Sequence, residues 1–227
     1  GLGNSYITES KEKNYTDLKK ITFMFFWLTG MCTSCFLGIF QPFMRLWVGE
    51  KFLMGFSVVV CLCVYFYLYE TTRLLNVFKN AGGIWHEDRF RPLISAIVNL
   101  ALNLISVNYI GIYGIVLSTI VALAVIEIPW LLQNIFTVMY DTSLFKDYFK
   151  MFVSWIIATV FSGVIIAVLT YKVTFSGWGA FAFFVVVSVL IPNIVFLLLM
   201  HTTEEFKLSI SMVSRITHNK LPIIKNL

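Results

Sequence analysis

Residues 92–126 read PLISAIVNLALNLISVNYIGIYGIVLSTIVALAVI and contain no charged side chain. Gly111 and Gly114 mark a tight turn within this stretch, which divides it into two apolar runs, 92–109 and 110–126. An α-helix needs about 20 residues to cross a bilayer, and each run approaches that length. The stretch therefore predicts a hairpin of two membrane-spanning helices.

Four more runs without charge flank this hairpin. They are residues 21–44, 52–69, 151–171 and 173–200. Charged residues make up only 13% of the 227-residue chain, whereas soluble domains typically contain about 25%. We therefore predict an all-α polytopic membrane protein in which six transmembrane helices form one bundle.

The positive charges lie in alternate connectors between the runs. Fourteen of the 17 Lys and Arg residues would share one side of the membrane, and only Arg45, Lys51 and Lys172 would lie on the other. Because Lys and Arg concentrate in cytoplasmic loops, this bias predicts that both termini are cytoplasmic. The same bias accounts for most of the net charge of +5, so we expect no nucleic-acid partner.

The ends of the chain are more polar than its middle. We expect a cytoplasmic connector at residues 1–20, with a helix entered near Asn14, and a six-helix bundle at residues 21–200. In the tail, residues 201–227, Thr202 and Glu205 have the spacing of a capping box. Apolar residues follow at helical spacing on one face: Phe206, Ile210, Val213 and Ile216. This pattern predicts an amphipathic helix on the inner membrane surface.

The beginning of the chain and its cysteines support the same interpretation. The chain starts at Gly1 without a signal-peptide pattern, so we expect it to be a piece of a longer protein. Cys32, Cys35, Cys61 and Cys63 all lie in apolar runs, where cysteine behaves as a small packing residue. We expect no metal, no cofactor and no catalytic residue.

Four short stretches carry a resemblance to a known family. They are Gly3-Asn4; Pro42-Phe43 followed by Leu46-Trp47-Val48-Gly49; Phe78 to Gly83 followed by Asp88 to Pro92; and Asn99, Leu100 and Asn103 followed by Gly111 to Ile115 and Ser118-Thr119. In this order and spacing, over residues 3–130, they resemble the C-terminal half of bacterial polysaccharide exporters and oligosaccharide flippases. That group belongs to the superfamily that includes the multidrug and toxin extrusion transporters.

The resemblance implies a fold and a function. The fold would be one half of a transporter similar to the multidrug and toxin extrusion proteins, paired with a missing N-terminal bundle across a central cavity. The function would be to move an undecaprenyl-diphosphate-linked oligosaccharide across the bacterial cytoplasmic membrane, in contact with membrane lipid and without enzymatic activity. Two alternatives stay open: a membrane-embedded glycan polymerase or ligase, and a small-molecule extruder of the same superfamily.

Glu127 and the Glu70–Arg73 pair are the first candidate substrate or coupling-ion residues. An acid within an apolar run is costly to bury and is a candidate for proton uptake, although Glu127 lies near enough to the inner face for partial solvation. Glu70 and Arg73 are three residues apart, so they can form a local ion pair near the inner surface. Alternatively, Arg73 faces the cavity and binds the substrate's diphosphate.

Further basic residues are candidates at the two membrane surfaces. Arg45, at the outer end of the first run, can anchor the interface or meet the polar head of the substrate. Lys79, Arg89 and Arg91 border the longest polar loop and are candidates for contact with cytoplasmic headgroups, either of lipid or of substrate. We expect Asn99 and Asn103, one turn apart, to bond between helices rather than to sugar.

Overall fold

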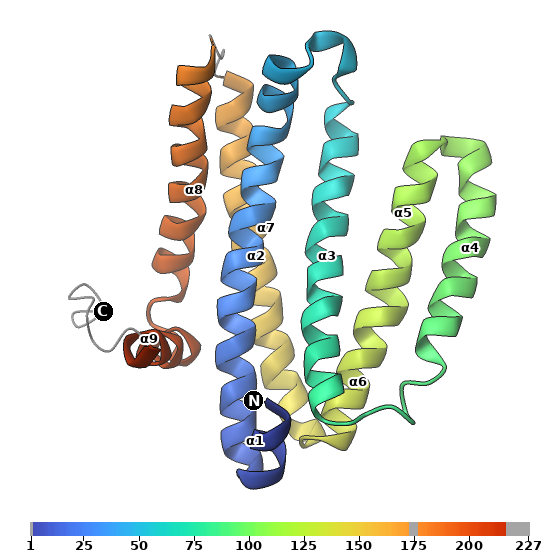
Figure 1. Ribbon diagram of the computed structural model, residues 1–227, viewed down its shortest axis with the longest axis vertical. Helices are drawn as coiled ribbons and strands as arrows, with labels where there is room; N and C mark the ends of the chain where they lie inside the picture. Colours follow the sequence, from blue (N-terminus) through green and yellow to red (C-terminus); the bar gives the residue numbers. More distant parts are fainter. Residues whose placement is uncertain (1, 173–176, 217–227) are drawn as a thin grey trace.

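The computed structural model describes residues 2–172 and 177–216, with side chains described for residues 2–170 and 177–211. The described chain is all-α, and six long apolar helices in one bundle are candidate membrane spans, as predicted (Figure 1). The spans are formed by α2 (Lys11–Trp47), α3 (Phe56–Ala81), α4 (Arg91–Ile110), α5 (Ile112–Ala122) with η2 (Leu123–Glu127) and α6 (Ile128–Val138), α7 (Phe145–Lys172) and α8 (Trp178–Met200). Shorter elements are α1 (Leu2–Thr8), η1 (Glu50–Phe52), η3 (Thr142–Leu144) and α9 (Glu204–Ile216).

Two helix starts differ from the predicted ones. The first long helix begins at Lys11 rather than near Asn14, because the Ser10 hydroxyl accepts the Lys13 backbone N–H at 3.3 Å and caps the helix earlier. Before α9, Thr203 accepts the Phe206 N–H at 3.4 Å, so Thr203 rather than Thr202 occupies the capping position. Both corrections move a boundary by a few residues and leave the order of helices unchanged.

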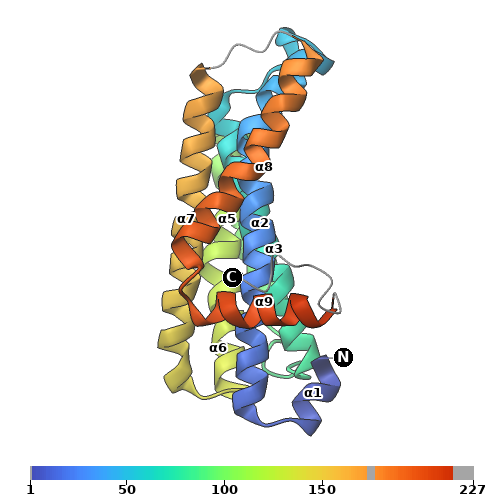
Figure 2. The same cartoon turned by 90° about the vertical axis from the view of Figure 1, so that its left-hand side faces the viewer.

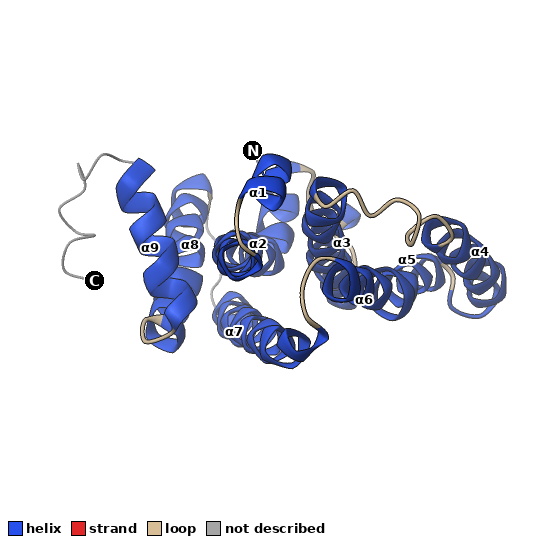
Figure 3. Cartoon of the chain, turned by 90° about the horizontal axis from the view of Figure 1, so that it is seen from below, coloured by secondary structure: helices blue, strands red, loops and turns tan. Residues whose placement is uncertain are grey.

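The helices form an elongated row when the bundle is viewed along its axis (Figure 3). α9 and α8 lie at one end, α2 and α7 follow, then α3 and α6, and the α4–α5 hairpin lies at the other end. Aromatic rings fill the centre: Phe26 of α2 stacks on Trp155 of α7 at 5.3 Å between centroids and contacts Tyr67 of α3 at 5.6 Å. α2 is thus the axis on which α3, α7 and α8 pack.

α9 runs across the other helices instead of along them (Figure 2). Its Phe206 is buried against Phe23 and Trp27 of α2, and its Glu204 accepts a hydrogen bond from Lys19 at 2.9 Å. An amphipathic helix in this orientation is typical of a membrane surface, which is the place that the sequence predicts for this tail. The side chains of Val213 and Ile216, and residues 217–227 of the predicted tail, lie outside the described part of the chain.

The predicted hairpin of α4 and α5 is tightly closed. Gly111 makes the turn with a positive φ of 55°, and a Cβ on Gly114 would lie 2.6 Å from the backbone carbon of Ser106. The Ser106 and Ser118 hydroxyls are 2.9 Å apart across the two helices. Small residues and interhelical hydroxyl bonds of this kind are common where membrane helices approach closely.

Candidate functional site

Four charged side chains meet in the interior at the end of the bundle where α3, α4 and α6 adjoin their loops. Lys79, Asp88, Arg91 and Glu127, which we call the buried charge cluster, have side chains only 3% to 12% exposed. Arg91 is at its centre: Nε and Nη2 donate to the two Asp88 carboxylate oxygens at 2.6 and 2.8 Å, and Nη1 contacts Glu127 Oε2. Lys79 Nζ lies 3.2 Å from the same Asp88 carboxylate. The two positive and two negative charges balance.

Two amide side chains complete the cluster. Asn76 of α3 accepts from Arg91 Nη2 at 3.0 Å, and Asn134 of α6 donates to Asp88 Oδ1 at 3.5 Å. All three nitrogens of the Arg91 guanidinium group therefore have an oxygen partner. Because every nitrogen has a partner, the buried charge of Arg91 is tolerated; an unpaired ion in a low-dielectric interior costs several kcal/mol.

The local sequence explains how Asp88 reaches the cluster. α3 ends at Ala81, and Gly83 adopts a positive φ of 69°, which turns the chain back under the helix. Gly82 packs so closely on α6 that a Cβ there would lie 2.4 Å from the Met139 sulfur. Ile84 and Asp88, four residues apart, then point inward and are 1% and 2% exposed. The loop is consequently a fixed element that delivers a carboxylate to Arg91.

Glu127 is placed by an irregular turn. Residues Leu123–Glu127 form a π-helical turn between α5 and α6, and Pro129 follows without an N–H to donate. Single π-helical turns inside α-helices are frequent at functional sites. The sequence shows Glu127 with no partner, but the structure pairs it with Arg91 of the neighbouring helix.

The charge pairs govern the ionisation of the loop carboxylate. Burial disfavours the charged form of Asp88, but the hydrogen bonds and charges of Arg91 and Lys79 outweigh burial and hold the pKa of the Asp88 carboxyl below its ordinary value of 3.8. Asp88 is therefore ionised at neutral pH. Protonating Glu127, in contrast, would remove one of the two carboxylates that hold Arg91.

The other predicted residues lie outside the cluster. Arg73 donates to Glu70 at 2.9 Å on α3, where the Arg73 side chain is 63% exposed, and Arg45 Nε lies 3.4 Å from Glu50 at the opposite end of the bundle. Arg89 is exposed and hydrogen-bonds to His86 at 2.9 Å. Asn103 donates to Asn99 at 3.2 Å within α4, so the prediction that these amides bond between helices was wrong.

The structure separates the three predicted headgroup-contact residues. Lys79 and Arg91 use their charges inside the buried cluster, and only Arg89 presents its side chain at the surface. Asp88, Asn76 and Asn134 were not predicted as members of the site. One signal was present for Asp88, because it lies three residues before Arg91, a spacing that brings two side chains together on a helical turn.

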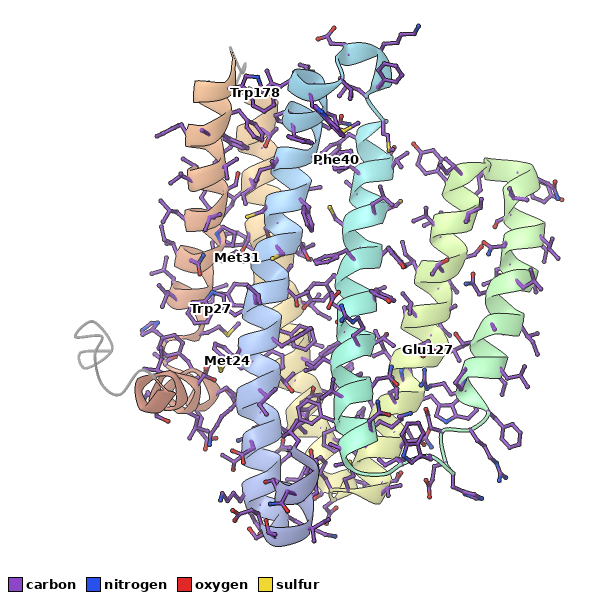
Figure 4. All side chains as sticks on the ribbon, in the orientation of Figure 1. Met24, Trp27, Met31, Phe40, Glu127 and Trp178 are labelled. Carbon is purple, nitrogen blue, oxygen red and sulfur yellow. The ribbon has the colours of Figure 1, made fainter. Side chains whose placement is uncertain are left out.

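The height of the cluster can be compared with α9. In Figure 4, Met24 lies beside α9, and Glu127 lies at about the same height as Met24 on the other side of the bundle. A membrane surface at α9 would place the cluster near the boundary between hydrocarbon and headgroups. Closer to the middle of the bundle, an apolar groove of about 520 Å³ opens between α3 and α7, with residues such as Val64, Tyr67 and Val160 along it.

Comparison with known proteins adds no family assignment, since no family model, no curated protein and no solved structure matches this chain.

Proposed function

We propose that this chain is one helical bundle of a membrane transporter that moves lipid-linked oligosaccharide, carried on undecaprenyl diphosphate, across a bacterial cytoplasmic membrane. The substrate class comes from the resemblance of residues 3–130 to polysaccharide exporters and flippases. In this proposal the end of the bundle with the buried charge cluster faces the cytoplasm, a second bundle completes the transport cavity, and the protein is not an enzyme.

The buried charge cluster is the observation that carries a transport function. Alternating access needs an element with two discrete arrangements. The α4–α5 hairpin suits this role: α4 is largely exposed and packs chiefly on α5 and η2, while Arg91 links its first turn to Asp88 and Glu127. Exchanging those ion partners would let the hairpin pivot at the π-helical turn.

The apolar groove between α3 and α7 supports the lipid-linked nature of the cargo. Its lining is almost entirely hydrocarbon, with hydroxyls of residues such as Thr33 and Thr159 among its few polar groups. Such a groove suits a prenyl chain better than a sugar, because sugar hydroxyls would lose water without finding hydrogen-bond partners.

A transport assay in proteoliposomes tests this proposal. The chain, together with the preceding bundle that the resemblance implies, would be reconstituted with undecaprenyl-diphosphate-linked oligosaccharide, and external glycosidase would report how fast protected glycan becomes accessible. We expect transport above the protein-free rate, reduced at least tenfold by Glu127→Gln, because the neutral amide no longer holds Arg91. Glu70→Gln, which neutralises the acid of the Glu70–Arg73 pair outside the cluster, is the matched control and should stay within twofold.

Two results would count against the proposal. Accessibility equal to that of protein-free vesicles would remove the flippase function. Undiminished transport by Glu127→Gln would leave transport in place and remove the cluster from its mechanism.

A further inference from the structure

The outward side of the loop beneath α4 presents a basic and aromatic surface. Trp85 and Phe90 are 62% and 52% exposed, and His86 and Arg89 are exposed between them. We call these four residues the loop rim. Large aromatic side chains left exposed beside cations are typical of protein surfaces that contact membrane headgroups.

The loop rim is held in place from below. Ile84 and Asp88 are buried, so the residues between and after them are forced outward. Lys79, a member of the buried charge cluster, places its ammonium group 4.1 Å from the centre of the Trp85 ring, and the Arg89 guanidinium lies 4.7 Å from the Phe90 ring. The rim therefore needs little ordering when it meets a ligand.

Arg89 differs from its two basic neighbours in having no carboxylate partner. Within the described residues, Lys79 and Arg91 both pair with Asp88, whereas no ion pair includes Arg89. Its one side-chain hydrogen bond is to His86 Nε2, which leaves the remaining guanidinium N–H groups for an anion. Glu87 is also exposed in this loop and opposes that attraction.

The position of the rim relative to the bilayer follows from α4. Directly after Phe90, the outward face of α4 exposes Leu93, Ile97, Leu100 and Leu104, each between 57% and 63%. Such a row is tolerated where hydrocarbon covers it. The rim thus lies where hydrocarbon gives way to headgroups, and the loop between α3 and α4 lies toward the same end of the bundle as α9 and closer to that end (Figure 1).

We infer that the loop rim binds the headgroup phosphate of an anionic phospholipid. Arg89 donates N–H groups to phosphate oxygens, and Trp85 and Phe90 pack beside the glycerol region. The surface needs only that the six helices span a bilayer, so it does not depend on the transport function proposed above.

Lipid selectivity measured on the whole chain tests this inference. The chain in nanodiscs of phosphatidylcholine with a minor fraction of phosphatidylglycerol would be titrated with spin-labelled lipids of both kinds. Because a surface Arg contributes about 1 kcal/mol to attraction for anionic lipid, Arg89→Gln should lower phosphatidylglycerol selectivity at this site about fivefold. Glu87→Gln should raise selectivity.

Lys146→Gln is the matched control, since it removes one exposed positive charge from the same end of the bundle. It measures the general attraction of one cation, so its loss should be smaller than that of Arg89→Gln, which also gives up the hydrogen bonds to phosphate. Equal losses in Arg89→Gln and Lys146→Gln would show a general charge effect and overturn the inference.

Fluorescence supplies a second readout that does not depend on charge. A headgroup-level quencher on phosphatidylcholine should quench less of the total tryptophan emission in Trp85→Phe than in the unmodified chain, because Trp85 lies at that depth. Unchanged quenching would place Trp85 away from the interface and would also overturn the inference.

Discussion

The centre of the bundle and the α4–α5 hairpin are held together by different forces. Around α2, aromatic rings pack densely: Phe23, Phe26 and Trp155 are each at most 1% exposed and contact rings of neighbouring helices. The hairpin has few buried side chains of its own, and buried residues of α4 include only Arg91 and Ser95. It depends on close backbone approach at its tip, on the packing of α5 against α3 and on ion pairs at its base.

The molecule can therefore change shape more readily at the hairpin than at its centre. Interdigitated rings permit few alternative arrangements without leaving voids. Ion pairs can be exchanged or protonated, and a π-helical turn lies beside them. We therefore expect the aromatic centre to act as a fixed frame and the hairpin to be the element that moves.

The largest expected effect comes from Arg91→Met. Removing this side chain leaves Glu127 without a cation and Asp88 with only Lys79, and breaking a buried pair from one side typically costs about 3 to 5 kcal/mol. Hydrogen exchange in nanodiscs should rise in α4 and α5 and stay unchanged in α7 and α8. Equal increases in both regions would erase the distinction between frame and hairpin.

Phe26→Ala tests the frame. Its ring stacks on Trp155 and contacts Phe152 and Tyr67, so truncation should destabilise the bundle by about 3 kcal/mol through the cavity it leaves. Unfolding followed by steric trapping would measure the loss. Hydrogen exchange should rise in α7 and α8 and stay unchanged in α4 and α5, the reverse of the pattern expected for Arg91→Met. Unchanged exchange in α7 and α8 would contradict the comparison.

Gly114→Val should have a smaller effect, confined to the tip of the hairpin. A Cβ at this position would meet the Ser106 backbone at 2.6 Å, so the helices must separate, at a cost of about 2 kcal/mol. Loss of a disulfide engineered across the tip would report the separation. Gly179→Ala is the control, because in the described part of the chain no atom beyond its neighbours and its own helix backbone lies within 4 Å of the Cβ it would add.

The smallest effect is the response of the loop to acid. The pKa of Asp88 is lower in the folded chain than its ordinary value of 3.8. The ionised carboxylate therefore contributes its full stabilisation of the fold above pH 3.8, and this stabilisation is lost as the pH falls through the lowered pKa. Hydrogen exchange of residues 82–90 should stay slow from neutral pH to about pH 4. Faster hydrogen exchange of this loop beginning near pH 6 would show that a group other than Asp88 holds the loop in place.

The membrane spans could be predicted from the sequence, but the ion pairs of the buried charge cluster could not. Long uncharged runs determine which helices can cross a bilayer, and the structure confirms six such helices. The partner of Glu127 lies 36 residues away on another helix, and local spacing cannot identify it. The start of α2 was predicted near Asn14, but Ser10 caps the helix, which begins at Lys11.

The hairpin itself contained a signal that sequence reasoning did not use. Residues at equal distances from the turn lie at the same height, because both helices rise about 1.5 Å per residue. Arg91 is 20 residues before Gly111 and Glu127 is 16 residues after it. The two are therefore offset by about one turn, which an Arg side chain can span.

A double-mutant cycle on Arg91 and Glu127 tests the central claim most directly, namely that this pair ties the hairpin to the frame. Unfolding free energies in bilayers would be measured for Arg91→Met, Glu127→Met and the double variant, with Lys13 and Glu9, an exposed pair at the start of α2, as the control cycle. We predict a coupling of about 2 kcal/mol or more for the buried pair and about 0.5 kcal/mol for the control. Equal couplings in the two cycles would contradict the account.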